Sequence, residues 1–174
     1  GVKQWTRQLG TSTNDEGTGV TVDSSDNIYV MGNTEGGLDN NTNSGGWDFF
    51  LVKYNSSGTK QWTQQLGTSS EDSGKGVTVD SSNNIYVTGF TSGGLDGNTN
   101  LGARDIFLVK YNSSGEKQWT QQLGGPSGND DGRGVTVDSS NNIYVTGITN
   151  KGLDNTFRGW SQDTFLVKYN SSGV

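Results

Sequence analysis

The chain is built from three nearly identical sequence repeats. The motif Lys-Gln-Trp-Thr begins at residues 3, 60 and 117, and the motif Asn-Ile-Tyr-Val begins at residues 27, 84 and 142. The motif Phe-Leu-Val-Lys-Tyr-Asn-Ser-Ser-Gly begins at residues 50, 107 and 165. The period is 57 or 58 residues, and three copies account for all 174 residues. Since self-similarity at a fixed period is the signature of repeat architectures, we expect one structural unit three times.

Each repeat predicts four short strands. In the first copy we expect them at residues 19–23, 27–32, 48–55 and 60–66, where β-branched and aromatic residues alternate with polar ones. Between these segments lie Gly, Asn, Ser and Asp, and the chain has 28 glycines against one proline, which favours many tight turns. No stretch shows the 3.6-residue period of an amphipathic helix. The sequence therefore predicts an all-β fold.

A four-stranded antiparallel sheet repeated at this period is typical of a β-propeller blade. The connections at residues 24–26 and 55–58 are short enough for hairpin turns, whereas those at 33–47 and 67–75 are longer. In strand order A to D, the long connections are the B–C and D–A loops. We divide the chain into an N-terminal strand (1–10), blade repeat 1 (11–66), blade repeat 2 (67–123) and blade repeat 3 (124–174), which lacks its own outer strand.

The motifs also resemble a known family. Asp-Ser-Ser-(Asp/Asn)-Asn-Ile-Tyr-Val, followed by Phe-Leu-Val-Lys-Tyr-Asn-Ser-Ser-Gly and Gln-Trp, is similar to the SBBP repeat of bacterial β-propellers, and the resemblance covers all three copies. It implies a propeller fold in a bacterial protein, outside the cell or on its surface. It carries over no catalytic residues.

The order of strands predicts how a ring could close. Residues 2–9 match the fourth strand of a repeat without its first three, and the third copy stops where its fourth strand would begin. Propellers generally have about 4–8 blades, so three blades do not close a ring. We expect a head-to-tail homodimer of six blades; a trimer of nine blades and a piece of a longer propeller are the alternatives. In the dimer, residues 2–9 would pair with residues 165–170 of a partner chain.

Composition excludes several functions. The chain has no His and no Cys, which removes Ser-His-Asp and Cys-His catalysis, zinc sites of the His/Cys type and disulfides. Its net charge of −6 argues against nucleic acid or an anionic membrane as partner. No apolar run approaches the roughly 18 residues of a membrane span. We expect a protein that is not an enzyme.

Two sets of acidic residues are candidate cation sites. Asp15, Asp72 and Asp130 recur in the D–A loops, where a propeller would bring them to the mouth of its channel; the alternative is solvated turns. A second set alternates with oxygen-bearing residues in the A–B turns, as calcium ligands do, although Asx-turns explain them more simply. These weaker candidates are Asp23, Asp80 and Asp138. We expect no cofactor, with calcium as the one possibility.

The B–C loops differ most among the copies, and they carry the candidate ligand-binding residues Trp47, Arg104, Phe157, Arg158 and Trp160. Exposed aromatic residues beside Asn and Asp are typical of carbohydrate recognition. Alternatively, the loops fold onto their own blades through Leu38, Leu95 and Leu153. The sequence thus supports an interaction or structural module that presents its D–A and B–C loop face to a protein, with a lectin-like module as the second hypothesis.

Overall fold

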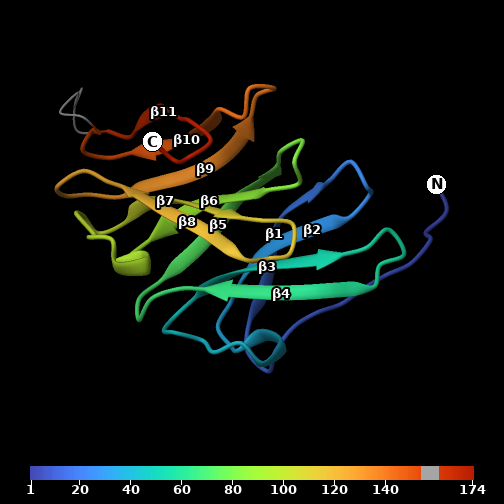
Figure 1. Cartoon of the computed structure of the whole chain (residues 1–174). Coiled ribbons are helices and arrows are strands. Elements are labelled where there is room, and N and C mark those ends of the chain that lie inside the picture. The colour runs from blue at the N-terminus through green and yellow to red at the C-terminus, as the bar shows by residue number, and fades with distance from the viewer. Residues whose placement is uncertain (154–160) are drawn as a thin grey trace.

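The computed structural model describes residues 1–153 and 161–174, which form three antiparallel sheets side by side, one from each repeat (Figure 1). We call them blades 1, 2 and 3. Blade 1 contains β1 (Asp15–Val22), β2 (Ile28–Thr34), β3 (Asp48–Tyr54) and β4 (Lys60–Leu66). Blade 2 contains β5 (Asp72–Val79), β6 (Ile85–Thr91), β7 (Asp105–Tyr111) and β8 (Lys117–Leu123). Blade 3 contains β9 (Asp130–Val137), β10 (Ile143–Thr149) and β11 (Asp163–Tyr169).

The strands of each blade are hydrogen-bonded in chain order, as successive hairpins require. Blades 1 and 2 have four strands each, and blade 3 has three, ordered β11-β10-β9. The all-β class and the four-stranded blade are therefore confirmed. Within the single chain the array is open, because nothing pairs with the free edge of β11 in the described residues.

The innermost strand of each blade is longer than its apolar residues indicate. We expected the first strand to begin at Gly19, but β1 begins at Asp15 and passes through a bulge between Gly17 and Gly19. Gly32 lies opposite Gly17, and a Cβ at Gly32 would come within 2.0 Å of the Glu16 carbonyl oxygen and 2.4 Å of the Phe50 ring. Only glycine fits at residue 32, which allows β2 to pack closely against β1 and the Phe50 ring.

The C–D turns explain the repeated Asn-Ser-Ser-Gly motif. The side-chain oxygen of Asn55 accepts hydrogen bonds from the backbone N–H groups of Ser57 and Thr59, at 3.1 and 2.8 Å. Gly58 has a φ of +74°, which an L side chain rarely adopts. The motif is thus a local turn that reverses the chain between β3 and β4.

Apolar side chains of neighbouring blades meet in two cores, which we call the first junction (blades 1 and 2) and the second junction (blades 2 and 3). In the first junction the rings of Phe49 and Phe107 stack with their centroids 4.7 Å apart. Tyr29, Met31 and Leu51 complete the blade 1 side of this core. The second junction repeats the arrangement with Tyr86, Ile106 and Leu108 of blade 2 against Ile143 and Val145 of blade 3. Blade-to-blade packing therefore forms the hydrophobic core.

The N-terminal segment does not form the strand that the sequence predicts within the single chain. Residues 1–14 contain no strand. The segment runs beside blade 1 as an extended chain (Figure 1). The fourth-strand position of blade 1, next to β3, is already occupied by β4. Its pairing with a partner's third blade stays a prediction.

Candidate functional site

One side of blade 1 lies uncovered by any other blade. We define the open flank of blade 1 as Val20, Val22, Ile28, Val30, Phe50, Val52 and Tyr54. Val20 and Val22 are 67% and 57% exposed, which is unusual for valines on a strand. The flank also holds a separate small apolar cluster that includes Phe50, Val52 and Tyr54.

The same side of blade 2 is covered. At the positions equivalent to Val20 and Val22, Val77 and Val79 pack against the core of the first junction. Ile85 and Val87, which correspond to Ile28 and Val30, are fully buried. Val20 and Val22 are therefore solvent-exposed in blade 1, whereas the same residue types at the same positions of blade 2 pack against a core, and the difference is the presence of a neighbouring sheet.

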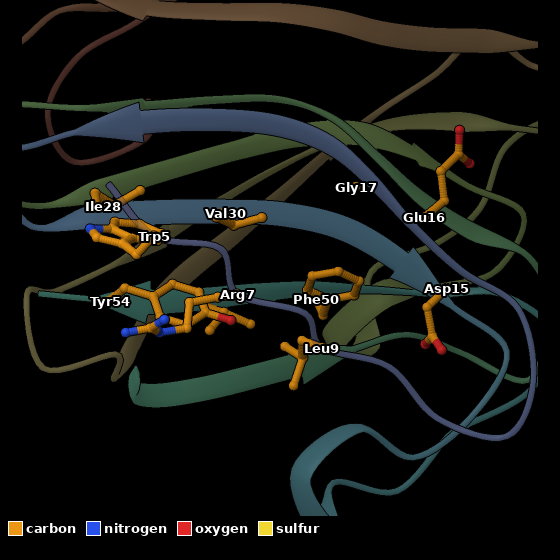
Figure 2. Close-up of a pocket in the computed structure, with 11 residues that line it drawn as sticks. Trp5, Arg7, Leu9, Asp15, Glu16, Gly17, Ile28, Val30, Phe50 and Tyr54 are labelled. Atoms are coloured by element: carbon orange, nitrogen blue, oxygen red, sulfur yellow. The ribbon is translucent and has the colours of Figure 1, made fainter. Parts of the chain in front are cut away.

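The N-terminal segment covers part of the open flank of blade 1. Figure 2 shows Trp5 beside Ile28, Arg7 beside Tyr54 and Leu9 below Phe50, around a cavity of about 210 Å³. Arg7 fixes the segment: its Nε donates a hydrogen bond of 2.7 Å to the carbonyl oxygen of Gly58. Trp5 remains 39% exposed, so the segment covers the flank incompletely.

Trp5 makes the contact that the other repeated tryptophans make at the junctions. Trp62 lies against Gly115 in the C–D turn of blade 2, and Trp119 lies in the same way against Gly173 of blade 3. Trp5 lies against Gly58 of blade 1. The segment therefore occupies, relative to blade 1, the place that β4 occupies relative to blade 2.

Blade 3 has an open flank on its opposite side, made of Gly134, Thr136, Tyr144, Thr146, Thr164 and Leu166. Leu166 is 72% exposed, whereas its equivalents Leu51 and Leu108 are buried in the two junctions. Tyr144 corresponds in the same way to Tyr29 and Tyr86, which are fully buried. Sequence analysis missed both flanks as candidate sites, although equivalence between repeats would have identified their residues.

The D–A and B–C loops lie together at one end of the blades. The backbone N–H of Asp72 donates to the carbonyl oxygen of Trp47 at 2.7 Å, and that of Asp130 donates to Arg104 at 2.9 Å. The side chains of Asp72 and Asp130 are fully buried. Their carboxylates accept hydrogen bonds inside their own loops, for example from Thr68 to Asp72 at 2.6 Å.

The environments of the three D–A aspartates differ with blade packing. Burial raises the pKa of Asp72, against hydrogen bonds from Thr91 and Thr68, and the neighbouring carboxylate of Asp48 raises it further. Burial likewise raises the pKa of Asp130. The pKa of Asp15 is instead lowered, because in spite of partial burial the hydrogen bonds from Thr11 and Thr34 favour its charged form. Asp15 lacks the preceding blade that the other two pack against.

The weaker calcium candidates are engaged in their own turns. Oδ1 of Asp23 accepts the backbone N–H groups of Ser25 and Asn27, and Oδ2 accepts the Asn27 amide and the Tyr29 hydroxyl, all at 2.9–3.0 Å. Asp80 and Asp138 make the same four bonds in their blades. This is the Asx-turn arrangement. Among the described residues, no three His, Cys, Asp or Glu side chains gather into a potential metal site.

The candidate residues of the B–C loops have different surroundings. Arg104 forms a 2.9 Å ion pair with Glu71, and its guanidinium lies 3.9 Å above the ring of Phe90. Trp47 is partly buried. Phe157, Arg158 and Trp160 lie outside the described residues. The leucines of these loops, Leu38, Leu95 and Leu153, are buried, so the loops of blades 1 and 2 and the described start of the third fold onto their blades.

The part of the chain that the structure describes contains no helix long and apolar enough to cross a membrane. The chain resembles two larger proteins. It is 30% identical to an uncharacterized WD repeat-containing protein of Acanthamoeba polyphaga mimivirus, over 82% of this chain and 13% of the viral protein. It is 26% identical to the regulatory protein FlaEY of Caulobacter vibrioides, over 84% of this chain and 17% of that protein. The chain thus spans less than a fifth of either relative.

The repeat units match a family model as well. The model of the SBBP β-propeller repeat matches residues 4–39, 61–96 and 118–154, one match in each copy. Each match begins near the repeated tryptophan and ends at or near the buried leucine of the B–C loop. The chain therefore belongs to the SBBP β-propeller repeat family.

Proposed function

We propose that the chain is a non-catalytic interaction module that closes a propeller ring with copies of itself, head to tail, and presents its D–A and B–C loops to a protein partner. In repeat proteins each unit packs against its neighbours, and the end units need a polar cap, so an end unit without such a cap exposes the apolar face that a neighbour would cover. The open flanks of blades 1 and 3 are such faces. Their mutual correspondence is the observation that carries the proposal.

The two open flanks match the two sides of a blade junction. Along the open flank of blade 3, Tyr144 and Leu166 stand at the positions through which blade 1 contributes Tyr29 and Leu51 to the first junction. The open flank of blade 1 carries the residue types that blade 2 contributes to the same junction. A second copy is thus expected to place its blade 1 on blade 3 with the geometry already present twice within the chain.

The N-terminal segment fits the same arrangement. β11 has a free edge at which a fourth strand is missing, and residues 2–9 have a fourth-strand sequence without a partner strand. Trp5 already contacts Gly58 as a fourth-strand tryptophan contacts the following blade. When blade 3 of a partner docks on the open flank of blade 1, its β11 is expected to pair with this segment. Two chains would give six blades, and three chains nine.

We infer a protein rather than a glycan as the partner of the blade 1 loop. The amide of Asn41 donates to the Leu38 carbonyl oxygen at 2.8 Å, and that of Asn43 donates to Gly46 at 3.1 Å. Oδ1 of Asn43 accepts the Gly45 N–H at 2.7 Å. These amides hold the loop together, so fewer of their hydrogen-bonding positions are free for sugar hydroxyls. A glycan array with no response supports the protein partner, and a specific sugar signal would favour the lectin-like function instead.

Deletion of residues 1–9 tests ring closure. In the proposed ring it would remove a fourth strand and a buried Trp5, and loss of a buried Trp side chain costs about 3–5 kcal/mol. We expect the full chain to form a closed oligomer and the truncated chain to form monomers or aggregates. Size-exclusion chromatography with light scattering measures the masses.

Removal of residues 1–3 alone is the matched control, because it leaves Trp5 and Arg7 in place, and it should preserve the oligomer. An unchanged oligomer mass after deletion of residues 1–9 would contradict strand exchange. A full chain that stays monomeric at high concentration would instead show that its flanks require further blades from a longer chain.

A further inference from the structure

A charged cavity lies between blades 2 and 3 at the end where the D–A and B–C loops meet. It measures about 530 Å³ and is lined by Glu71, Lys75, Phe90, Arg104, Asp131 and Arg133, which we call the second-junction pocket. Three cationic and two anionic side chains give it a net charge of +1, in a chain whose net charge is −6. A local excess of positive charge in an acidic protein favours anionic ligands.

Some charged side chains of the second-junction pocket form ion pairs and others do not. Arg104 is held by its ion pair with Glu71 and by the Phe90 ring beneath it. Lys75 and Arg133 are exposed, and neither forms a salt bridge within residues 1–153 and 161–174. Nζ of Lys75 lies 5.8 Å from the centroid of the Phe90 ring. The pocket therefore holds two solvent-exposed cations that no carboxylate of the described residues neutralises.

The pocket also departs from the repeat. In the first junction the positions of Glu71, Lys75, Phe90 and Arg104 are taken by Asn14, Thr18, Asn33 and Trp47. Ser73 stands there in place of Asp131, and of the six lining positions only that of Arg133 is again cationic, as Lys75. The equivalent positions in the first junction therefore carry one cation where the second-junction pocket carries three.

We propose that the second-junction pocket binds a carboxylate of a partner protein, carried by an acidic side chain. Lys75 and Arg133 would donate charge-assisted hydrogen bonds to the two carboxylate oxygens. The volume lies within the range of about 300–1,000 Å³ that is usual for small-ligand sites. The identity of the partner as a protein rests on the proposed function. The pocket itself lies within one chain, so it remains available whether or not the ring closes.

A matched pair of peptides tests the proposal. The full chain, labelled with ¹⁵N, is titrated with acetyl-Glu-Glu-amide and with the neutral acetyl-Gln-Gln-amide in an NMR experiment. We expect the glutamate peptide to shift the amide signals of Lys75, Arg133 and neighbouring residues, and the glutamine peptide to leave them unchanged. Lys75→Thr and Arg133→Thr should each weaken binding about tenfold, the usual effect of losing a charge-assisted hydrogen bond.

The variants are chosen from the chain itself. Threonine is the residue that blade 1 carries at the equivalent position, Thr18, so both variants should fold. Lys3→Thr removes the same charge from an exposed position away from the pocket and should bind normally. The proposal is overturned if the glutamate peptide causes no shift, if the glutamine peptide binds equally well, or if inorganic phosphate or glucuronic acid binds more tightly than the glutamate peptide. If the protein is monomeric and still binds the glutamate peptide, ring closure is wrong and the pocket proposal stands.

Discussion

Blade 1 and blade 2 show what the same side chains do with and without a neighbour. Val77 of blade 2 packs in the core of the first junction, whereas Val20, its counterpart in blade 1, is 67% exposed. The aspartates that open the innermost strands show the same contrast, since the pKa of Asp72 is raised by burial and that of Asp15 is lowered by hydrogen bonds. A blade of this family is therefore completed by the sheet beside it, and not by its own four strands.

The largest expected effect comes from placing a charge at Val77, and the matched variant places the same charge at its exposed counterpart Val20. Val77→Asp puts a carboxylate against the apolar core of the first junction and should lower the free energy of unfolding by about 3 kcal/mol. Val20→Asp should change the stability of the monomeric chain by less than about 0.5 kcal/mol, since it stays in solvent. Urea unfolding at low protein concentration measures both.

The same two variants also test ring closure when they are studied at high protein concentration. In a closed ring Val20 would be buried, so Val20→Asp should prevent assembly even though it leaves the monomer intact. Equal losses of monomer stability for the two variants would break the comparison.

A smaller effect is expected where a tryptophan contacts a glycine of the next blade. Gly115 has a φ of +84°, and a Cβ there would come within 2.9 Å of Trp62. Gly115→Ala should cost about 1 kcal/mol for backbone strain and about 1–3 kcal/mol more for the clash. Gly97 has a similar φ of +80° with no atom within 4 Å of a Cβ, so Gly97→Ala isolates the strain. Thermal unfolding of the two variants gives the difference.

Gly58→Ala is the open-flank counterpart of Gly115→Ala. Its Cβ would approach Trp5, which is 39% exposed and free to move away. We expect its effect in the monomer to be close to that of Gly97→Ala. A loss as large as that of Gly115→Ala would mean that the N-terminal segment is held as firmly as β4.

The smallest effect is a difference in pH dependence between Asp72 and Asp15. A raised pKa means that the folded state binds the proton more readily than the unfolded state, so Asp72 makes the folded state more stable as the pH falls through its folded pKa toward about 4. For Asp15 the sign is opposite: its stabilisation exists above about pH 4 and is lost as the pH falls through its lowered folded pKa.

Urea unfolding between about pH 7 and pH 2.5 distinguishes the two aspartates. On lowering the pH, the stability of wild type relative to Asp72→Asn should increase, and its stability relative to Asp15→Asn should decrease. The same slope for both variants would show that the neighbouring blade does not control these groups.

Much of the fold could be predicted from the sequence because the same pattern of strands and turns occurs in all three repeats. The second, third and fourth strands of each repeat were placed to within a few residues by β-branched and aromatic alternation. The start of β1 was missed because Glu16 and Gly17 look like a loop, whereas in the structure residues 15–17 pair with β2 before the bulge at Gly17–Gly19. The N-terminal strand was predicted from its similarity to β4, but a strand needs a partner edge; β4 already pairs with β3 in the adjacent blade, and the free edge of β11 belongs to blade 3.

The candidate sites were less predictable because their environment depends on contacts between blades. Asp72 was expected near a channel mouth, yet hydrogen bonds with its own loop and the packing of blade 1 bury it. Arg104 was selected from the loops, but its partners Glu71 and Phe90 lie 33 and 14 positions away in the sequence and converge only through the hairpins of blade 2. Sequence composition alone does not reveal such convergence.

The contact between each tryptophan and the following glycine turn has a direction along the chain. Trp62 is made one repeat before Gly115, and Trp119 one repeat before Gly173. During synthesis each indole therefore emerges from the ribosome before the turn that will cover it. The indole stays exposed until the next C–D hairpin has been translated. Folding should then advance from the N-terminus in steps of one repeat, with the newest blade always the least protected against proteases and chaperones.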